Sequence, residues 1–273
     1  MYYLMIIVTI CYLLSSTSYF AYLFLQKKAL NRGALGLITA GVVLHTVMIV
    51  AAFTSSGYLP ARNLQQTLSL AAWAVASCYV VLQTRLQLKV LGVFAAPLAA
   101  VAMLAATHLP GSTIATEPVL KGFWLTFHVV AIFLGEAALA LACGTGLLYL
   151  TQEHAIKTKK PGFFFKRLPS LDLLDATGYS CIVAGFTLLT IGLVVGLVYA
   201  KMVWGRFWSW DPKEVWTAIT WLLYAALLHQ RLMVGWRGRR AAIMAIIGFA
   251  VLLFTFLGVN FLLSGHHGGF TRW

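Results

Sequence analysis

Long apolar stretches, separated by short polar segments, dominate the pattern of this 273-residue chain. About 20 consecutive apolar residues form a helix that crosses the roughly 30 Å hydrocarbon core of a bilayer. Eight segments approach or exceed that length, at residues 3–25, 34–54, 68–83, 90–107, 122–151, 176–203, 215–232 and 241–263. The pattern predicts about eight transmembrane helices, the third being the shortest, with both termini on one side of the membrane.

The composition agrees with this pattern. Apolar side chains make up 61% of the residues and charged ones 10%, which excludes an ordinary soluble domain. We therefore expect an all-α, polytopic integral membrane helical bundle, formed by a single domain over residues 1–273. The first apolar stretch has neither a basic segment before it nor a small-residue cleavage pattern, so it is expected to be a retained helix and not a removed signal peptide.

Lysine and arginine are distributed unevenly between the connecting segments. Fourteen of the 20 lie in the connections after the first, third, fifth and seventh predicted helices, and six lie on the opposite side. By the positive-inside rule, the larger group faces the cytoplasm. Both termini and residues 204–216 are then expected to face outward, towards the periplasm in a bacterial inner membrane. The net charge of +13 is thus explained by orientation in a lipid bilayer, and no nucleic-acid partner is expected.

The four cysteines stand singly in apolar segments and form no C-x-x-C pair. Neither thiol exchange nor a structural zinc site is therefore expected.

Residues 204–216, WGRFWSWDPKEVW, are the densest group of aromatic and ionisable side chains in the chain. One interpretation is an aromatic belt, because tryptophan is enriched where membrane helices leave the bilayer. A belt needs only one or two rings at each helix end, whereas four tryptophans here share one short segment with charges of both signs. This combination favours a surface for a large flat ligand that carries anionic groups.

The same segment resembles the tryptophan-rich "WWD" signature, W-G-x-x-W-x-W-D-x-K-E-x-W, of the membrane haem-handling proteins of cytochrome c maturation. Residues 220–231, TWLLYAALLHQR, and 258–267, GVNFLLSGHH, resemble the CcsA or ResC type of the system II cytochrome c synthase. The resemblance covers more than the C-terminal half. The N-terminal part matches mainly in hydropathy and in one histidine.

The charged residues of the signature have structural as well as ligand-binding interpretations. Asp211, Pro212 and Glu214 match the residue preferences at the N-cap and in the first turn of a helix. Asp211 is therefore expected either to begin the seventh helix or to contact a ligand. Arg206 and Lys213 either pair with carboxylates such as haem propionates or form a solvated rim.

Three histidines near the outer surface are candidate ligands, whereas His108, at the outer end of the fourth predicted helix, is not. His128 lies near the outer end of the fifth predicted helix, and His266 and His267 follow the eighth. Neutral imidazole is the usual protein ligand of haem iron, so these helices can provide a bis-histidine site beside the tryptophans. The resemblance implies His128 and His267 as the outward ligands. Because HHGGF stands where the family often has LHSYA, His266 remains an alternative.

Three further ionisable residues lie within the membrane, where such residues are functional candidates. His45 and His229 lie about 14 and 21 Å from the outer surface at 1.5 Å per residue, and the resemblance implies that they are inner ligands which can share a second haem. Glu136, in the fifth predicted helix, either pairs with a histidine or lines a polar path, or is a satisfied polar group of the bundle.

The resemblance implies a haem-binding membrane component of a cytochrome c synthase. Haem b (iron protoporphyrin IX) would be held at the outward site and presented to the C-x-x-C-H segment of apocytochrome c for thioether formation. A membrane protein of the CcsB or ResB type is the expected partner in this lyase-type reaction. No catalytic residue is expected, because haem and substrate carry the reactive groups. The residues expected to bind haem are His128, His267, His45, His229, Trp204, Trp208, Trp210, Asp211, Trp216, Arg206 and Lys213, with the four histidines on the iron.

Other functions remain open. A haem carrier of the CcmC type would deliver haem to a chaperone without making thioethers, although eight spans and two inner histidines argue against it. A HemX-type regulator of haem synthesis would be expected to lack the histidines. A quinol-oxidising cytochrome b would carry paired histidines at helical spacing, which are absent from the sequence. A channel that moves haem across the membrane is compatible with the inner histidines.

Overall fold

The computed structural model describes residues 2–86, 88–110, 122–158, 162–163 and 165–262, and every regular element within them is helical. The longer helices are α1 (Tyr2–Leu25), α2 (Lys28–Ser56), α3 (Leu64–Leu86), α4 (Gly92–His108), α5 (Phe123–Lys157), α6 (Leu171–Trp204), α7 (Pro212–His229) and α8 (Arg239–Leu253). The shorter ones are η1 (Lys89–Leu91), η3 (Gln230–Val234), η4 (Phe254–Gly258) and α9 (Val259–Leu262), of which η3 and η4 are π-helical turns.

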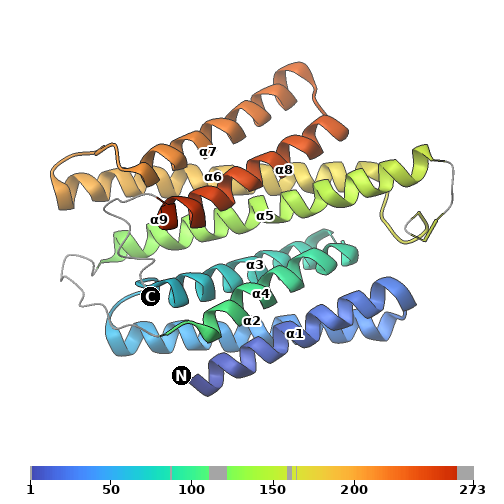
Figure 1. Ribbon diagram of the computed structural model, residues 1–273, viewed down its shortest axis with the longest axis horizontal. Helices are drawn as coiled ribbons and strands as arrows, with labels where there is room; N and C mark the ends of the chain where they lie inside the picture. The colour runs from blue at the N-terminus through green and yellow to red at the C-terminus, as the bar shows by residue number, and fades with distance from the viewer. Residues whose placement is uncertain (1, 87, 111–121, 159–161, 164, 263–273) are drawn as a thin grey trace.

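Seven of the described helical segments are long and apolar enough to cross a membrane. The remaining predicted span, the seventh, corresponds to α7, which has 18 residues, continues into η3 and runs beside α6 and α8 (Figure 1). The predicted polytopic helical bundle is therefore confirmed. The third span is longer than its hydropathy indicates: α3 has 23 residues, because polar residues at both of its ends are also helical.

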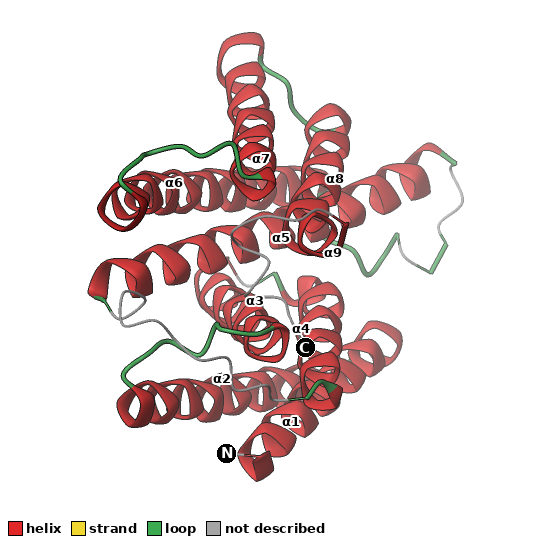
Figure 2. Ribbon diagram, turned by 60° about the vertical axis from the view of Figure 1, so that its left-hand side comes forward, coloured by secondary structure: helices red, strands yellow, loops and turns green. Residues whose placement is uncertain are grey.

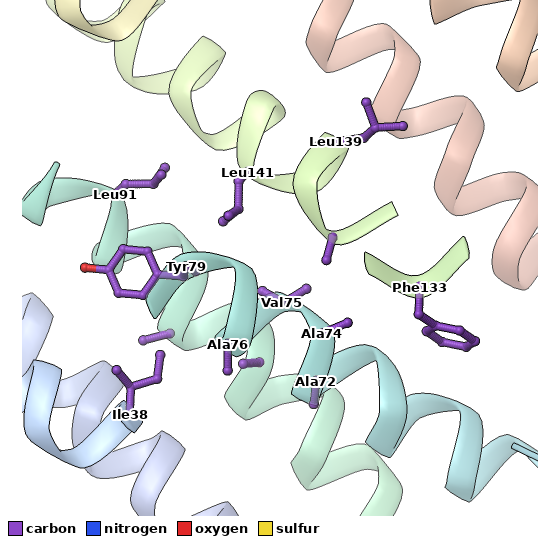
Figure 3. Close-up of a cluster of buried hydrophobic side chains, with 14 of the residues drawn as sticks. Ile38, Ala72, Ala74, Val75, Ala76, Tyr79, Leu91, Phe133, Leu139 and Leu141 are labelled. Carbon is purple, nitrogen blue, oxygen red and sulfur yellow. The ribbon is translucent and has the colours of Figure 1, made fainter. Parts of the chain in front are cut away.

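The helices form two groups. Figures 1 and 2 show α1 to α4 on one side and α5 to α8 on the other, with α3 packed against α5 between them. Small residues of α3, such as Ala72, Ala74 and Ala76, are buried within the bundle. Close backbone approach through small residues is typical of membrane bundles, where helices gain little from hydrophobic burial alone. Figure 3 shows Ala74 on the side of α3 towards Phe133 of α5, whereas Ala72 and Ala76 point to the other side, where Ile38 lies.

The two ends of the bundle differ in chemistry. The loop of residues 205–211 lies at the same end as the start of α1 and the end of α9, and we call it the tryptophan end (Figure 1). The α1–α2, α3–α4 and α7–α8 connections, which belong to the lysine- and arginine-rich set, lie at the opposite end. We call it the basic end. This arrangement agrees with an even number of spans.

Ion pairs join the helices at the basic end. Arg231, in η3, donates to both carboxylate oxygens of Asp175 on α6, at 3.0 and 2.7 Å. The backbone N–H of Gly238 donates to the same carboxylate at 2.8 Å. Arg239 of α8 pairs with Glu153 of α5 at 3.1 Å. The α7–α8 connection is thus tied to both long central helices.

Helices α5 and α6 run antiparallel with small residues between them. A methyl group placed on each of four α6 glycines would come within 3.0 Å of an α5 side chain. The facing positions are Gly178 and Thr145, Gly185 and Leu139, Gly192 and Ile132, and Gly196 and His128. This contact sets the register that carries His128 to its place on α6.

Candidate functional site

A cavity of about 240 Å³ lies at the tryptophan end, and we call it the tryptophan cavity. Its walls come from the α2–α3 loop, α3, α5, α6, the 205–211 loop, α7 and η4. Four residues that the sequence indicated as haem-binding line it together: His128, Trp204, Trp208 and Lys213. A largely apolar cavity with a few convergent polar groups is typical of a small-molecule site.

His128 is held in one orientation by the neighbouring helix. Its Nδ1 lies 2.6 Å from the carbonyl oxygen of Gly192 on α6. A carbonyl oxygen only accepts hydrogen bonds, so Nδ1 carries the proton. In the neutral ring the lone pair is then on Nε2, and neutral imidazole is the form that binds a metal ion. The arrangement fits an axial ligand of haem iron.

The four tryptophans of the signature have different surroundings. Trp208 packs edge to face against Trp210, with ring centroids 5.9 Å apart and planes at 88°. Trp204 lines the cavity and is partly exposed, whereas Trp210 is 78% exposed and has a left-handed backbone with φ of 60°. The ring centroid of Trp216 lies 4.5 Å from that of Phe254 in η4. Two of the four rings therefore form the cavity wall.

Asp211 begins α7, as one of the two sequence interpretations predicts. Its carboxylate accepts from the backbone N–H of Lys213 at 2.9 Å, and it is only 4% exposed. Glu214 accepts from the backbone N–H of Asp211 at 3.3 Å and from Ser209 through both the backbone N–H, at 2.8 Å, and the hydroxyl, at 2.9 Å. These acids complete a capping box and thereby fold the loop.

The two signature cations separate. Lys213 lines the cavity and interacts electrostatically with Glu136 of α5, which lines it too. Arg206 is exposed on the loop and is not part of the wall. Glu136 thus lines the same cavity as a lysine, an arrangement that sequence reasoning did not identify.

Arg62, which sequence reasoning missed, also lines the cavity. It comes from the α2–α3 loop, and its guanidinium lies 4.8 Å from the ring centroid of Tyr58, another wall residue. The sequence holds one indication of a role for Arg62: it is one of the six lysines and arginines expected on the outward side of the membrane. Nothing local linked that loop to the tryptophans.

The structure does not bring His45 and His229 together. His45 is fully buried in the α1–α4 group, and its two ring nitrogens lie 3.2 Å from Tyr12 Oη and 2.9 Å from Ser69 Oγ. His229 is exposed at the end of α7, on the opposite side of α5 and α6 (Figure 1). Comparable depth in the membrane therefore did not bring the two histidines together. His266 and His267 lie outside the described residues.

Comparisons with known proteins agree with the resemblance. A family model described as cytochrome C assembly protein matches residues 4–267. The cytochrome c biogenesis protein CcsA of Gloeothece citriformis is 33% identical over 281 residues, covering 84% of this chain and 86% of that protein. CcsA of Synechocystis sp. is 30% identical over 310 residues, covering 93% of each.

A solved structure shares the fold. The cytochrome c haem lyase CcmF matches with a TM-score of 0.63 over 98% of this chain and 47% of that one. At 16% identity this match carries the fold alone. The family match and the CcsA relatives extend over nearly the whole chain, including both helix groups and the tryptophan loop. The chain therefore belongs to the cytochrome c assembly protein family, as a multi-pass membrane protein of the CcsA type that acts in cytochrome c biogenesis.

Proposed function

We propose that this chain is the haem-binding component of a cytochrome c synthase. It would hold haem b, the substrate, in the tryptophan cavity and present it for thioether attachment to the C-x-x-C-H segment of apocytochrome c. The observation that carries the proposal is that His128, whose Nδ1 is held by the carbonyl oxygen of Gly192, shares one cavity with Trp204, Trp208 and Lys213.

Each wall of the cavity has a role in this proposal. His128 supplies one axial ligand, while Trp204 and Trp208 pack on the macrocycle. Lys213 and Arg62 pair with the propionates, arginine being the better bidentate partner. Asp211 and Trp216 act indirectly, because capping and packing hold the loop in place. Arg206 and Trp210, on the exposed side of the loop, are available to the incoming polypeptide.

The second axial ligand is proposed to be His267, with His266 as the alternative. Both follow α9 in the sequence, and the preceding turn η4 contributes Thr255 and Phe256 to the cavity wall. One imidazole would give way to the histidine of the substrate's C-x-x-C-H segment. His45 is left out of the proposed ligand set because both of its ring nitrogens are engaged.

The distribution of basic residues and the CcsA relatives support a proposal for the membrane, the orientation and the partner of this chain. We propose that the chain lies in a bacterial inner membrane with the tryptophan end towards the periplasm, since most basic residues lie at the other end. A partner of the CcsB or ResB type is proposed to complete the synthase. A haem carrier that makes no thioether is the second candidate, because the same cavity would serve it.

The test is an absorption spectrum of the complex purified with its CcsB-type partner. Wild type is expected to show a low-spin haem spectrum that His128→Ala and His267→Ala lose or alter. His108→Ala is the matched control, because His108 is an exposed histidine at the end of α4 that is bonded within its own helix to Leu104 and to Thr107. Absence of haem, or identical spectra for all variants, would refute the haem site.

Coexpression with an apocytochrome c separates the two candidate functions. A synthase yields covalently attached haem in the substrate, detected by haem staining of the denatured protein, and a carrier yields none.

A further inference from the structure

We propose that Gly192 and Gly196 of α6 are positioning residues for the haem ligand His128. This inference rests on the proposed function in assigning iron binding to His128. We call the surface of α6 that receives the imidazole the seat. It consists of the carbonyl oxygen of Gly192 and, one helical turn later, the space left by the missing side chain of Gly196, and it is a property of the α5–α6 contact.

The first component is the carbonyl oxygen of Gly192, which accepts the 2.6 Å hydrogen bond from Nδ1. Within a helix, each carbonyl oxygen already accepts from the N–H four residues later, but its second lone pair remains. Reaching that lone pair from another helix requires an open approach. Side chains tilt towards the helix N-terminus, so a side chain at position 196 would cover the carbonyl of residue 192.

The second component is the missing side chain of Gly196. A methyl group there would lie 2.6 Å from Cε1, 2.8 Å from Nδ1 and 3.5 Å from Nε2 of His128. The first two distances are shorter than carbon tolerates. The imidazole therefore lies directly on the helix backbone, and any larger residue would displace the ring and break its bond to Gly192.

Close helix packing alone does not account for this pair. Gly178 also meets α5 tightly, with a methyl there 2.8 Å from Thr145 Oγ1, yet no ionisable ring is involved. Gly192 and Gly196 differ because the ring they receive lines the tryptophan cavity. Groups that orient a metal-binding histidine typically change metal affinity about 10- to 100-fold when altered.

The experiment compares Gly196→Ala with the control Gly178→Ala, each in the full chain purified with its partner. Gly196→Ala is expected to reduce haem occupancy about tenfold or more and to shift the reduction potential and low-spin bands of the remainder. Gly178→Ala is expected to lower thermal stability while the spectrum stays that of wild type. Equal spectra for Gly196→Ala and wild type, or the same spectral change in Gly178→Ala, would overturn the inference.

A double-variant cycle guards against simple misfolding. In a His128→Ala background the added methyl at position 196 has room, so Gly196→Ala should cost little further stability. Gly178→Ala should cost the same in either background. If the losses of stability caused by His128→Ala and by Gly196→Ala simply add in the double variant, the proposal that Gly196 positions the His128 ring is refuted. If wild type binds no haem, the proposed function fails, but this cycle still tests whether Gly196 holds the ring.

Discussion

The Nε2 atom of His45 lies 2.9 Å from the hydroxyl oxygen of Ser69, inside the α1–α4 group. Its Nδ1 atom lies 3.2 Å from the hydroxyl of Tyr12, so one buried imidazole links α2 to both α1 and α3. Buried polar groups are expensive to leave unpaired. His45 therefore acts as a bridge between three helices in this arrangement.

We expect His45→Ala to destabilise the bundle without removing haem from the tryptophan cavity. The change leaves two buried hydroxyls without this partner, which typically costs about 1–3 kcal/mol each. Thermal unfolding in detergent measures the stability, with the exposed Thr54→Ala on the same helix as control. Loss of haem with unchanged stability would instead identify His45 as a ligand.

Lys213→Met should weaken haem binding about 10- to 100-fold. A hydrogen bond to a charged group contributes about 1.5–3 kcal/mol, and Lys213 lies in the cavity wall. Arg206→Met, on the exposed side of the loop, should change the dissociation constant less than about twofold, since exposed ion pairs are weak. Haem titration of the apoprotein distinguishes them, and a larger effect at Arg206 contradicts the assignment.

Substitutions at Asp211 separate helix capping from direct ligand binding. Asparagine caps nearly as well as aspartate, so Asp211→Asn should retain stability and haem affinity. Asp211→Ala should cost about 1 kcal/mol of stability and loosen the loop. If the asparagine variant loses haem as fully as the alanine variant, the carboxylate charge itself contacts the ligand.

Breaking the Arg231–Asp175 pair should be strongly destabilising. The two side chains are largely buried, at 10% and 17% exposed, and removing one partner of a fully buried pair costs about 3–5 kcal/mol, which is the upper bound expected here. Lys157→Gln is the control, because Lys157 pairs with Glu153 while 62% exposed and should cost less than about 1 kcal/mol. Similar melting temperatures for Arg231→Gln and Lys157→Gln would contradict this prediction.

Local features of the fold could be read from the sequence. Each apolar run must span the hydrocarbon and satisfy its own backbone, so run length predicts a helix. The cap at Asp211 was also predictable, because it depends on residues within one turn. The π-helical turns η3 and η4 were not predicted, because an apolar run does not indicate which residues its backbone hydrogen bonds join.

The candidate site could be predicted only in part. The tryptophan segment predicts where a flat ligand would bind, and both the position of His128 near the outer end of its helix and the family resemblance predict it as an iron ligand. The choice of Lys213 over Arg206 for the cavity wall depends on how the loop turns before α7. Arg62 enters from a loop more than 60 residues away from the nearest α5 wall residue, and no local pattern predicts that meeting.

The sequence by itself determined the approximate number of membrane helices and the start of α7, and it predicts that the tryptophan segment binds a flat ligand. Tertiary structure alone decided which helices are neighbours. It seated His128 on Gly192 and Gly196, and it placed His45 and His229 on opposite sides of the bundle. The physical reason is that lipid and protein interior are similarly apolar. Hydropathy therefore reports depth in the membrane, whereas lateral position depends on how small residues and hydrogen bonds fit one helix to the next.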